Sequence, residues 1–306
     1  MELFFAILLK IIPLYFLVIL GFIAGKYLDV NAKGIGKLII YIIAPIVIFE
    51  AITHASLSFS SLFIPIIAFS ISSFIAMIFF YYGKYKWGDS RANVLAIVAS
   101  EGNTGYFGIP IALLLFDQRV FGIYIMGTVG ITLFENTVVF YLTARGRHTV
   151  RESIKRLIRL PALYAFVLAN LFLYFNITLP SMMDNFISSM RGAYIVLGMM
   201  LIGFGISGIK KFSIDYQFIT LAFIGKFILW PLLVLVLVMI DYYFLGIYDI
   251  NAHRAFILLS IVPIAANTVV FATALNIYPE KVSTAVLFST FFGLLYVPIV
   301  IVFLFK

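Results

Sequence analysis

The chain has 306 residues, of which 64% are hydrophobic and 11% are charged, whereas an ordinary soluble domain is about 45–50% apolar and about 25% charged. This composition excludes a water-soluble protein and leaves room for about ten membrane-crossing helices, because one crossing takes about 20 residues. The chain has no cysteine and three histidines, which excludes disulfides, a cysteine nucleophile and a cysteine metal site and argues against a multi-histidine metal centre.

The order of apolar stretches predicts an all-α integral membrane protein. Charges, Gly/Pro clusters and polar runs separate ten such stretches, and each must be helical because strand edges would leave backbone groups unpaired in lipid. The predicted spanning helices cover residues 4–27, 36–55, 60–83, 92–116, 119–143, 161–178, 188–209, 216–244, 253–275 and 281–305.

A basic connector at residues 144–160 predicts the orientation. It contains Arg145, Arg147, Arg151, Lys155, Arg156 and Arg159. Such a loop stays on the cytoplasmic side, so both termini are predicted to face outward from a multi-pass protein of the cell membrane. A basic loop that binds DNA or lipid is the alternative, but the orientation rule already accounts for the net charge of +8, and no nucleic-acid partner is expected.

The two halves of the chain, residues 1–143 and 161–306, are predicted to be inverted repeats of five helices each. An odd number of crossings turns the second half upside down relative to the first. Corresponding positions in the fourth and ninth stretches share the pattern N-T-x-x-F, at residues 103–107 and 267–271. The shared position of the pattern favours a repeat.

The fourth stretch is predicted to be a broken helix at Gly102–Pro110. Three glycines loosen it, and Pro110 lacks an amide hydrogen, so carbonyls about one turn earlier lose their partners. Broken helices of this kind line the midplane sites of secondary transporters, although a simple proline kink is the alternative. In the ninth stretch a proline precedes Asn267 but none follows it, so a break there is less strongly indicated.

Ionisable residues at membrane depth are the second functional signal. Glu101, Glu135 and Lys226 lie about 14–17 Å from the cytoplasmic ends of their helices, where a charge costs about 2.5–3.5 kcal/mol or more. We expect the two carboxylates to converge on one polar centre, where one of them carries a coupling proton or holds a lysine in place. A Glu–Lys pair that only fixes helix packing is the alternative. Glu50 and His253 are expected to lie near the outer ends, with His253 in solvent.

Motifs along the whole chain resemble one family. They are Pro13, Leu20–Lys26, Lys37–Pro45, Phe49, Gly102–Pro110, Pro263, Asn267, Pro279 and Pro298. They resemble the auxin efflux carrier family, which includes prokaryotic members and the plant PIN-FORMED exporters. The resemblance implies ten helices in two inverted repeats, a scaffold part and a transporter part, outward termini and two crossing broken helices, and it is compatible with a homodimer.

The resemblance also implies a substrate site at the crossing. The candidate residues are Asn103, Thr104, Gly105, Gly108, Ile109, Pro110, Asn136, Asn267, Thr268, Val269 and Val270. The plant exporters carry a proline in both crossing segments, whereas the second segment here reads Val269-Val270. Prokaryotic relatives are associated with small organic anions, including dicarboxylates, so the family name does not establish auxin as the substrate.

The sequence is therefore interpreted as a secondary transporter for a small organic anion that works by an elevator-like movement. It contains no nucleotide-binding loop of the form G-x-x-x-x-G-K-S/T, so ATP would have to come from a partner, and no cofactor is expected. An enzyme is not predicted, because the sequence has no paired-histidine metal motif and no recognisable serine nucleophile site. An anion channel or passive facilitator that uses the same polar break is the alternative. Coupling to protons and coupling to sodium are both left open.

Overall fold

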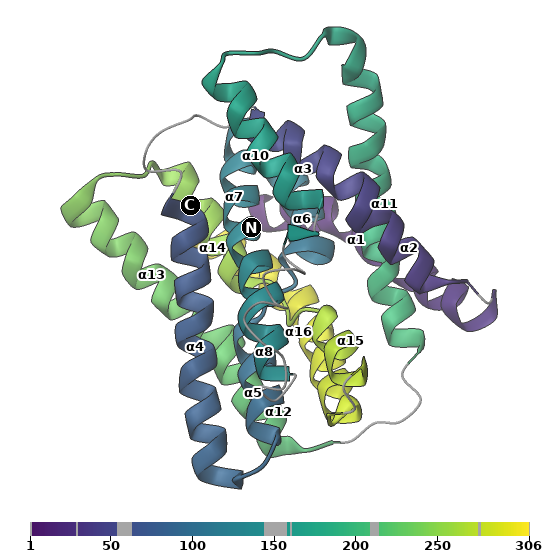
Figure 1. Cartoon of the computed structure of the whole chain (residues 1–306), viewed down its shortest axis with the longest axis vertical. Helices are drawn as coiled ribbons and strands as arrows, with labels where there is room; N and C mark the ends of the chain where they lie inside the picture. Colours follow the sequence, from purple (N-terminus) through teal and green to yellow (C-terminus); the bar gives the residue numbers. More distant parts are fainter. Residues whose placement is uncertain are drawn as a thin grey trace.

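The computed structural model describes residues 2–28, 30–53, 63–143, 158–159, 161–208, 214–274 and 277–305. All regular structure in these ranges is helical (Figure 1). The α-helices are α1 (Glu2–Tyr27), α2 (Ala32–Leu38), α3 (Ala44–Thr53), α4 (Ile64–Trp87), α5 (Arg91–Ser100), α6 (Ile109–Leu115), α7 (Gln118–Phe134), α8 (Phe140–Thr143), α10 (Pro161–Tyr174), α11 (Asp184–Ser207), α12 (Tyr216–Phe223), α13 (Trp230–Ile240), α14 (Ile250–Ile261), α15 (Asn267–Ala274) and α16 (Pro279–Leu304).

Short π-helical and 3₁₀ turns connect several of these helices. The π-helical turns are Ile39–Ile43, Thr104–Gly108, Glu135–Val139, Ile224–Leu229 and Asp241–Leu245, and Ser181–Met183 is a 3₁₀ turn. As a result, α2 with α3, α7 with α8, and α12 with α13 each form one longer helical rod. Three helices, α7, α12 and α14, begin at an aspartate whose side chain accepts a hydrogen bond from the amide three residues later, at Asp117, Asp215 and Asp249.

The prediction of an all-helical membrane protein is confirmed. Within the described residues, six uninterrupted helices are long and apolar enough to cross a bilayer, and five shorter apolar helices accompany them. Each stretch predicted from the sequence is represented by a helix or by two consecutive helices. The ten-helix inverted repeat stays a prediction. Of the charged connector residues only Arg159 is described, and Arg145, Arg147, Arg151, Lys155 and Arg156 lie outside the described residues.

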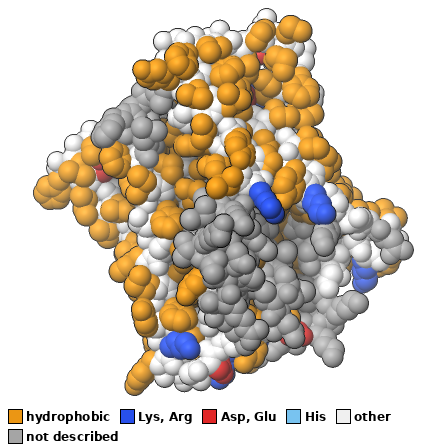
Figure 2. All heavy atoms as spheres, in the orientation of Figure 1, with side chains coloured by type: hydrophobic (Ala, Val, Ile, Leu, Met, Phe, Trp, Pro, Cys, Tyr) orange, Lys and Arg blue, Asp and Glu red, His pale blue; other side chains and the backbone are white. Residues whose placement is uncertain are grey.

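The core is built around three helices that other helices enclose. α5 is buried from Ala92 to Ser100, α7 is buried over most of its length, and α14 packs against α7. α4 packs on α5 and α7, and α10 packs on α3. Many large apolar side chains are exposed on the outside, and Figure 2 shows hydrophobic side chains across the upper part and the left side of the visible face. An apolar exterior around an enclosed core is what a lipid environment requires.

Helices α1 and α11 approach each other closely at glycines. A Cβ atom at Gly203 would lie 2.0 Å from the carbonyl oxygen of Val18, and one at Gly21 would lie 2.1 Å from the carbonyl oxygen of Met200. The two backbones are therefore in direct contact, as small residues allow in membrane helices. Gly205, two residues along α11, has nothing within 4 Å of a Cβ position.

Two polar groups near the ends of spans are buried, contrary to expectation. Glu50 is 2% exposed, and its Oε1 lies 3.2 Å from a guanidinium nitrogen of Arg191. His253 is 3% exposed, and its Nε2 lies 2.7 Å from Oδ2 of Asp241. The expectation that His253 lies in solvent is wrong because the start of α14 folds it against the end of the preceding rod.

A pair of matched substitutions in α11 tests the close contact with α1. Gly203→Ala is expected to force the two backbones apart and to lower the free energy of unfolding by about 1–3 kcal/mol, as overpacking does. Gly205→Ala is expected to be neutral or slightly stabilising, because alanine favours the helix and meets no neighbour. Thermal unfolding in detergent measures both. Equal melting temperatures for the two variants would contradict the described contact.

Candidate functional site

The first interrupted helix breaks between α5 and the turn Thr104–Gly108. Glu101 is extended, with φ −99° and ψ 123°. The break lies well before Pro110, which sits in the first turn of α6. The expectation that Pro110 opens the break is therefore wrong. A π-helical turn precedes Pro110, and the amide of Ile109 donates to the carbonyls of Gly105 and Thr104. Helical pairing therefore continues up to the proline, although the proline has no amide hydrogen of its own.

The second interrupted helix breaks between α14 and α15. Val262 adopts φ −62° and ψ 151° and is followed by Pro263. A residue before proline is biased toward this extended conformation, so the proline ends α14. Helical structure resumes at Asn267. The absence of a proline after Asn267 does not prevent the break.

The two extended segments cross and pair with each other. Gly102 and Ile264 form an isolated antiparallel bridge. The amide of Asn103 donates to the carbonyl of Pro263 at 2.7 Å, and the amide of Ala265 donates to the carbonyl of Glu101 at 3.2 Å. These two bonds pair backbone groups of one break with those of the other, as membrane depth favours. The crossing lies just before the segments 103–110 and 267–270 that the resemblance implied.

The rod formed by α12 and α13 caps the carbonyl ends of both broken helices. The indole Nε1 of Trp230 donates to the carbonyl of Ser100 at 2.7 Å. The ammonium of Lys226 donates to the carbonyl of Ser260 at 3.0 Å and lies 4.9 Å from the centroid of the Trp230 ring. Because cations are favoured at helix C-termini, this lysine is stabilised by the end of α14.

Gly102 leaves room for that lysine. A Cβ atom at Gly102 would lie 2.8 Å from Nζ of Lys226 and 2.9 Å from Cγ2 of Val262. Among the described residues Lys226 forms no ion pair with Glu101 or Glu135. The alternative of a Glu–Lys packing pair is therefore not what the structure contains.

Two carboxylates accompany the crossing. Glu101 is 0% exposed, and neither of its carboxylate oxygens has a hydrogen-bond partner among the described residues. Glu135 is partly exposed, and its Oε1 accepts a hydrogen bond from Nδ2 of Asn267 at 2.8 Å. Glu135 is close enough to act electrostatically on Glu101. One carboxylate is thus sealed behind the crossing while the other borders the start of α15.

The remaining predicted site residues fall into two groups. Gly105, Asn136 and Val269 are partly exposed, whereas the others with described side chains are buried by packing; these are Asn103, Thr104, Gly108, Ile109, Pro110 and Thr268. Asn136 donates to the carbonyl of Thr132 within its own helix. Oδ1 of Asn103 accepts from the amide of Phe107 and caps the turn that follows. The side chain of Val270 lies outside the described side chains.

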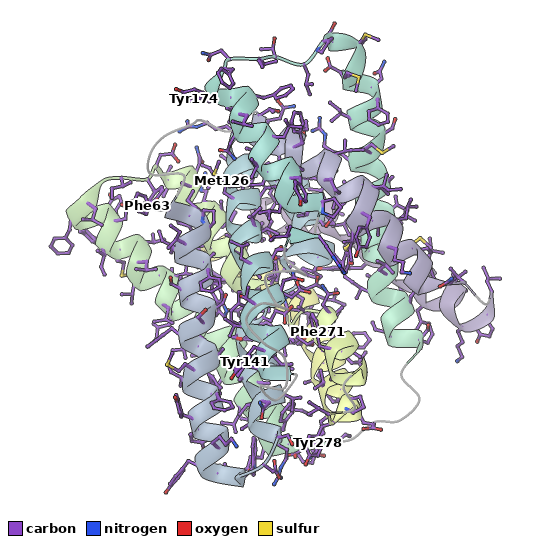
Figure 3. The ribbon with its side chains drawn as sticks, viewed as in Figure 1. Phe63, Met126, Tyr141, Tyr174, Phe271 and Tyr278 are labelled. Carbon is purple, nitrogen blue, oxygen red and sulfur yellow. The ribbon has the colours of Figure 1, made fainter. Side chains whose placement is uncertain are left out.

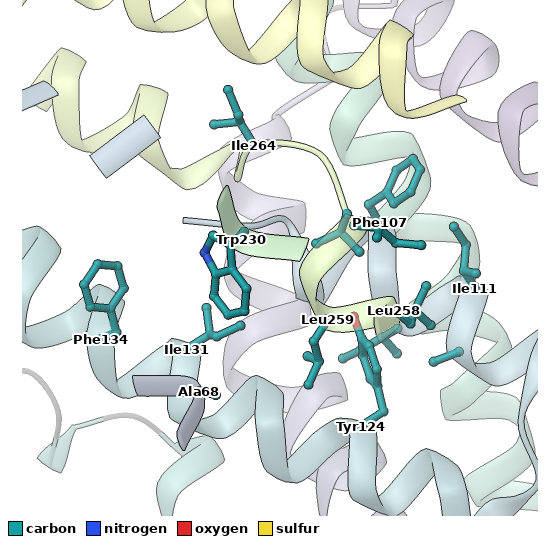
Figure 4. Packing of buried hydrophobic residues seen from close by; sticks show 14 of the residues in the cluster. Ala68, Phe107, Ile111, Tyr124, Ile131, Phe134, Trp230, Leu258, Leu259 and Ile264 are labelled. Atoms are coloured by element: carbon teal, nitrogen blue, oxygen red, sulfur yellow. The ribbon is translucent and has the colours of Figure 1, made fainter. Parts of the chain in front are cut away.

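Residues that the sequence analysis did not single out also build the site. The hydroxyl of Tyr124 on α7 donates to the carbonyl of Thr104 at 2.9 Å, and Tyr194 on α11 places its hydroxyl 3.4 Å from a Cβ position at Gly105. Figure 4 shows Tyr124, Phe107 and Trp230 around this buried centre. The sequence could have indicated that Trp230 belongs to the site, because it is one of two tryptophans and follows Lys226 by four residues, on the same helix face.

The fit between Gly108 and Tyr124 can be tested by a double-mutant cycle. A Cβ atom at Gly108 would lie 1.9 Å from the Tyr124 hydroxyl oxygen, so Gly108→Ala is expected to destabilise strongly. Tyr124→Phe loses a hydrogen bond worth about 0.5–1.5 kcal/mol but removes the clashing atom. The double variant is therefore expected to be more stable than the sum of the two changes predicts. Melting temperatures in detergent that add up would show that the two residues are not in contact.

Among the residues that the structure describes, no group of three His, Asp or Glu side chains is arranged to hold a metal ion.

A family model described as membrane transport protein matches residues 6–301. The chain is also 26% identical over 296 residues to an uncharacterized transporter of Methanocaldococcus jannaschii, a match that covers 91% of this chain and 92% of that relative. The chain belongs to the membrane transport protein family, the auxin efflux carrier family that its motifs resemble.

Proposed function

We propose that this membrane transporter carries a small organic anion, an auxin-like monocarboxylate or a dicarboxylate, through the crossing of its two broken helices. The observation that carries the proposal is that helical structure restarts at Thr104 and at Asn267, directly after the paired segments. A helix N-terminus carries a partial positive charge, which favours anions. Gly105, Asn136 and Asn267 are partly exposed beside them, so packing does not fully seal these ends.

Two kinds of helix contact support an elevator-like movement. α1 and α11 are in backbone contact at Gly203, which favours one rigid scaffold. By contrast, the contact of α11 with the first broken helix is looser, because a Cβ position at Gly198 lies 3.6 Å from the carbonyl oxygen of Tyr106. A contact of this kind on the face of α11 that carries Gly198 allows packed elements to slide, as they do in shear motions. We infer that the crossing moves along this face.

Glu135 is the proposed coupling residue. It borders Asn267, so its charge acts on the amide group that would meet the substrate. The ionisable groups that face it or its neighbours are Glu101, Tyr106, Tyr194 and Lys226. A proton on Glu135 removes a negative charge beside the anion site, and loss of that proton repels the anion. Lys226 balances charge behind the crossing.

The membrane setting follows the charge pattern. We infer a place in the cell membrane with both termini outside and the 144–160 connector in the cytoplasm. A homodimer is part of the same proposal. Coupling to sodium is the competing proposal to coupling by a proton, and the experiments below separate the two.

The substrate class can be tested with purified protein in proteoliposomes. Uptake and binding would be screened across monocarboxylates and dicarboxylates, with and without sodium, at two pH values. We expect carboxylates to compete, and the corresponding neutral amides not to compete, because the helix N-termini favour a negative charge. Competition by cations or neutral solutes alone would overturn the anion assignment. A requirement for sodium would replace the proton as the coupling ion.

Replacement of Glu135 by glutamine tests its role. The glutamine side chain keeps an oxygen for the hydrogen bond from Asn267 but cannot take up a proton, so Glu135→Gln is expected to flatten the pH dependence of transport. Glu280→Gln, at an exposed acid at the start of α16, is the matched control and should transport like the unchanged protein. A full pH dependence in Glu135→Gln would remove Glu135 from the coupling mechanism.

An anion channel or passive facilitator at the same break is the alternative function. A carrier that exposes one site alternately to the two sides shows saturable counterflow, in which unlabelled substrate inside the vesicle accelerates entry of labelled substrate. A continuous pore shows no such acceleration. Counterflow measurements therefore separate the two.

A further inference from the structure

An apolar cavity, which Trp230 helps to line, lies apart from the crossing segments. It has a volume of about 610 Å³ and lies between α4, α13 and α14. Ala68 and Ile71 of α4 line one wall, Val234 and Leu237 of α13 line another, and Leu259 of α14 and Trp230 complete it. Its volume is within the range of about 300–1,000 Å³ typical of ligand pockets.

The chemistry of the walls favours hydrocarbon. The ionisable side chains on the wall are Asp241 and His253, and Nε2 of His253 lies 2.7 Å from Oδ2 of Asp241. Asp241 also accepts hydrogen bonds from the amides of Ile247 and Tyr248, both at 3.0 Å. The acid is thus already satisfied and does not call for a polar ligand group. Water finds too few partners in such a cavity, and apolar molecules are favoured.

The helices that flank the cavity present apolar side chains to the surroundings. Ile66 on α4 is 57% exposed, and Leu232 and Ile240 on α13 are 53% and 41% exposed. Helix α4 and the rod formed by α12 and α13 are each long and apolar enough to cross a bilayer. Figure 3 shows Phe63, another lining residue, at the end of α4 beside the α13–α14 segment. The surface that continues from the cavity is therefore one that faces lipid.

We propose that this cavity binds an acyl chain of a bilayer lipid, which enters from the side between α4 and α13. The bilayer supplies hydrocarbon next to this surface, and an acyl chain gives the cavity walls the van der Waals partners that an empty cavity lacks. Ala68, Leu259 and the Trp230 ring, all labelled in Figure 4, line this cavity together. The bound chain would touch the same indole that donates to Ser100, so the lipid site adjoins the crossing without being part of the anion site.

Tryptophan fluorescence provides a direct test. The chain has two tryptophans, so Trp87→Phe leaves Trp230 as the sole emitter. This variant would be placed in vesicles of phosphatidylcholine with brominated acyl chains and in matched unbrominated vesicles. Trp230 is 1% exposed, so bromine quenches it on contact only from inside the cavity. We expect clear quenching in the brominated vesicles.

Two substitutions on α4 separate cavity lipid from surrounding lipid. Ala68→Phe fills the cavity and is expected to reduce the quenching several-fold, whereas Ile66→Phe, on the exposed face of the same helix, should leave it unchanged. Val234→Phe fills the cavity from the opposite wall and should act like Ala68→Phe, which covers the case in which one variant fails to fold.

Two results would overturn the proposal. One is the absence of quenching of Trp230 in brominated vesicles, and the other is equal quenching in the cavity-filling variants and Ile66→Phe. The measurement uses no transported substrate. Its outcome is therefore independent of the anion and coupling assignments.

Discussion

The fold depends on one constraint, which is that non-helical backbone at membrane depth must form its hydrogen bonds within the chain. Each broken helix exposes amides and carbonyls, and neither segment could persist alone at membrane depth. The antiparallel bridge between Gly102 and Ile264, with its two flanking hydrogen bonds, satisfies both segments together. Trp230 and Lys226 donate hydrogen bonds to the carbonyls of Ser100 and Ser260, at the C-terminal ends of the first halves of the two broken helices. A polar site thus exists because two defects compensate each other.

The charges at the site are arranged on two sides of this crossing. Glu101 is sealed among apolar groups without a hydrogen-bond partner among the described residues, which is an expensive arrangement that stability alone does not explain. Lys226 lies against Gly102 and bonds to a carbonyl rather than to an acid. Glu135 borders the open side through Asn267. Departures from ordinary packing rules of this kind concentrate where proteins carry out their function.

The sequence predicts the helices well because apolar length and charge placement reflect the bilayer directly. It also predicts two interruptions, since Asn-Thr pairs and prolines interrupt otherwise apolar runs. It could not indicate that Pro110 lies beyond the break, because a proline in the first turn of a helix that follows a π-helical turn does not interrupt the helix. Nor could it show that His253 meets Asp241 or that Lys226 meets Ser260, because those contacts depend on which helix faces are turned toward each other. Tertiary partners of this kind leave no periodic signal.

The crossing also constrains the order in which the protein can be assembled. The indole that caps Ser100 comes from a residue 130 positions later in the chain, and the strand-like partner of Gly102 comes later still. During synthesis the first broken helix therefore enters the membrane before these two hydrogen-bond partners of its break exist. It must wait as a continuous helix or with its carbonyls bound to water, and it reaches its final shape only when the last third of the chain has been inserted.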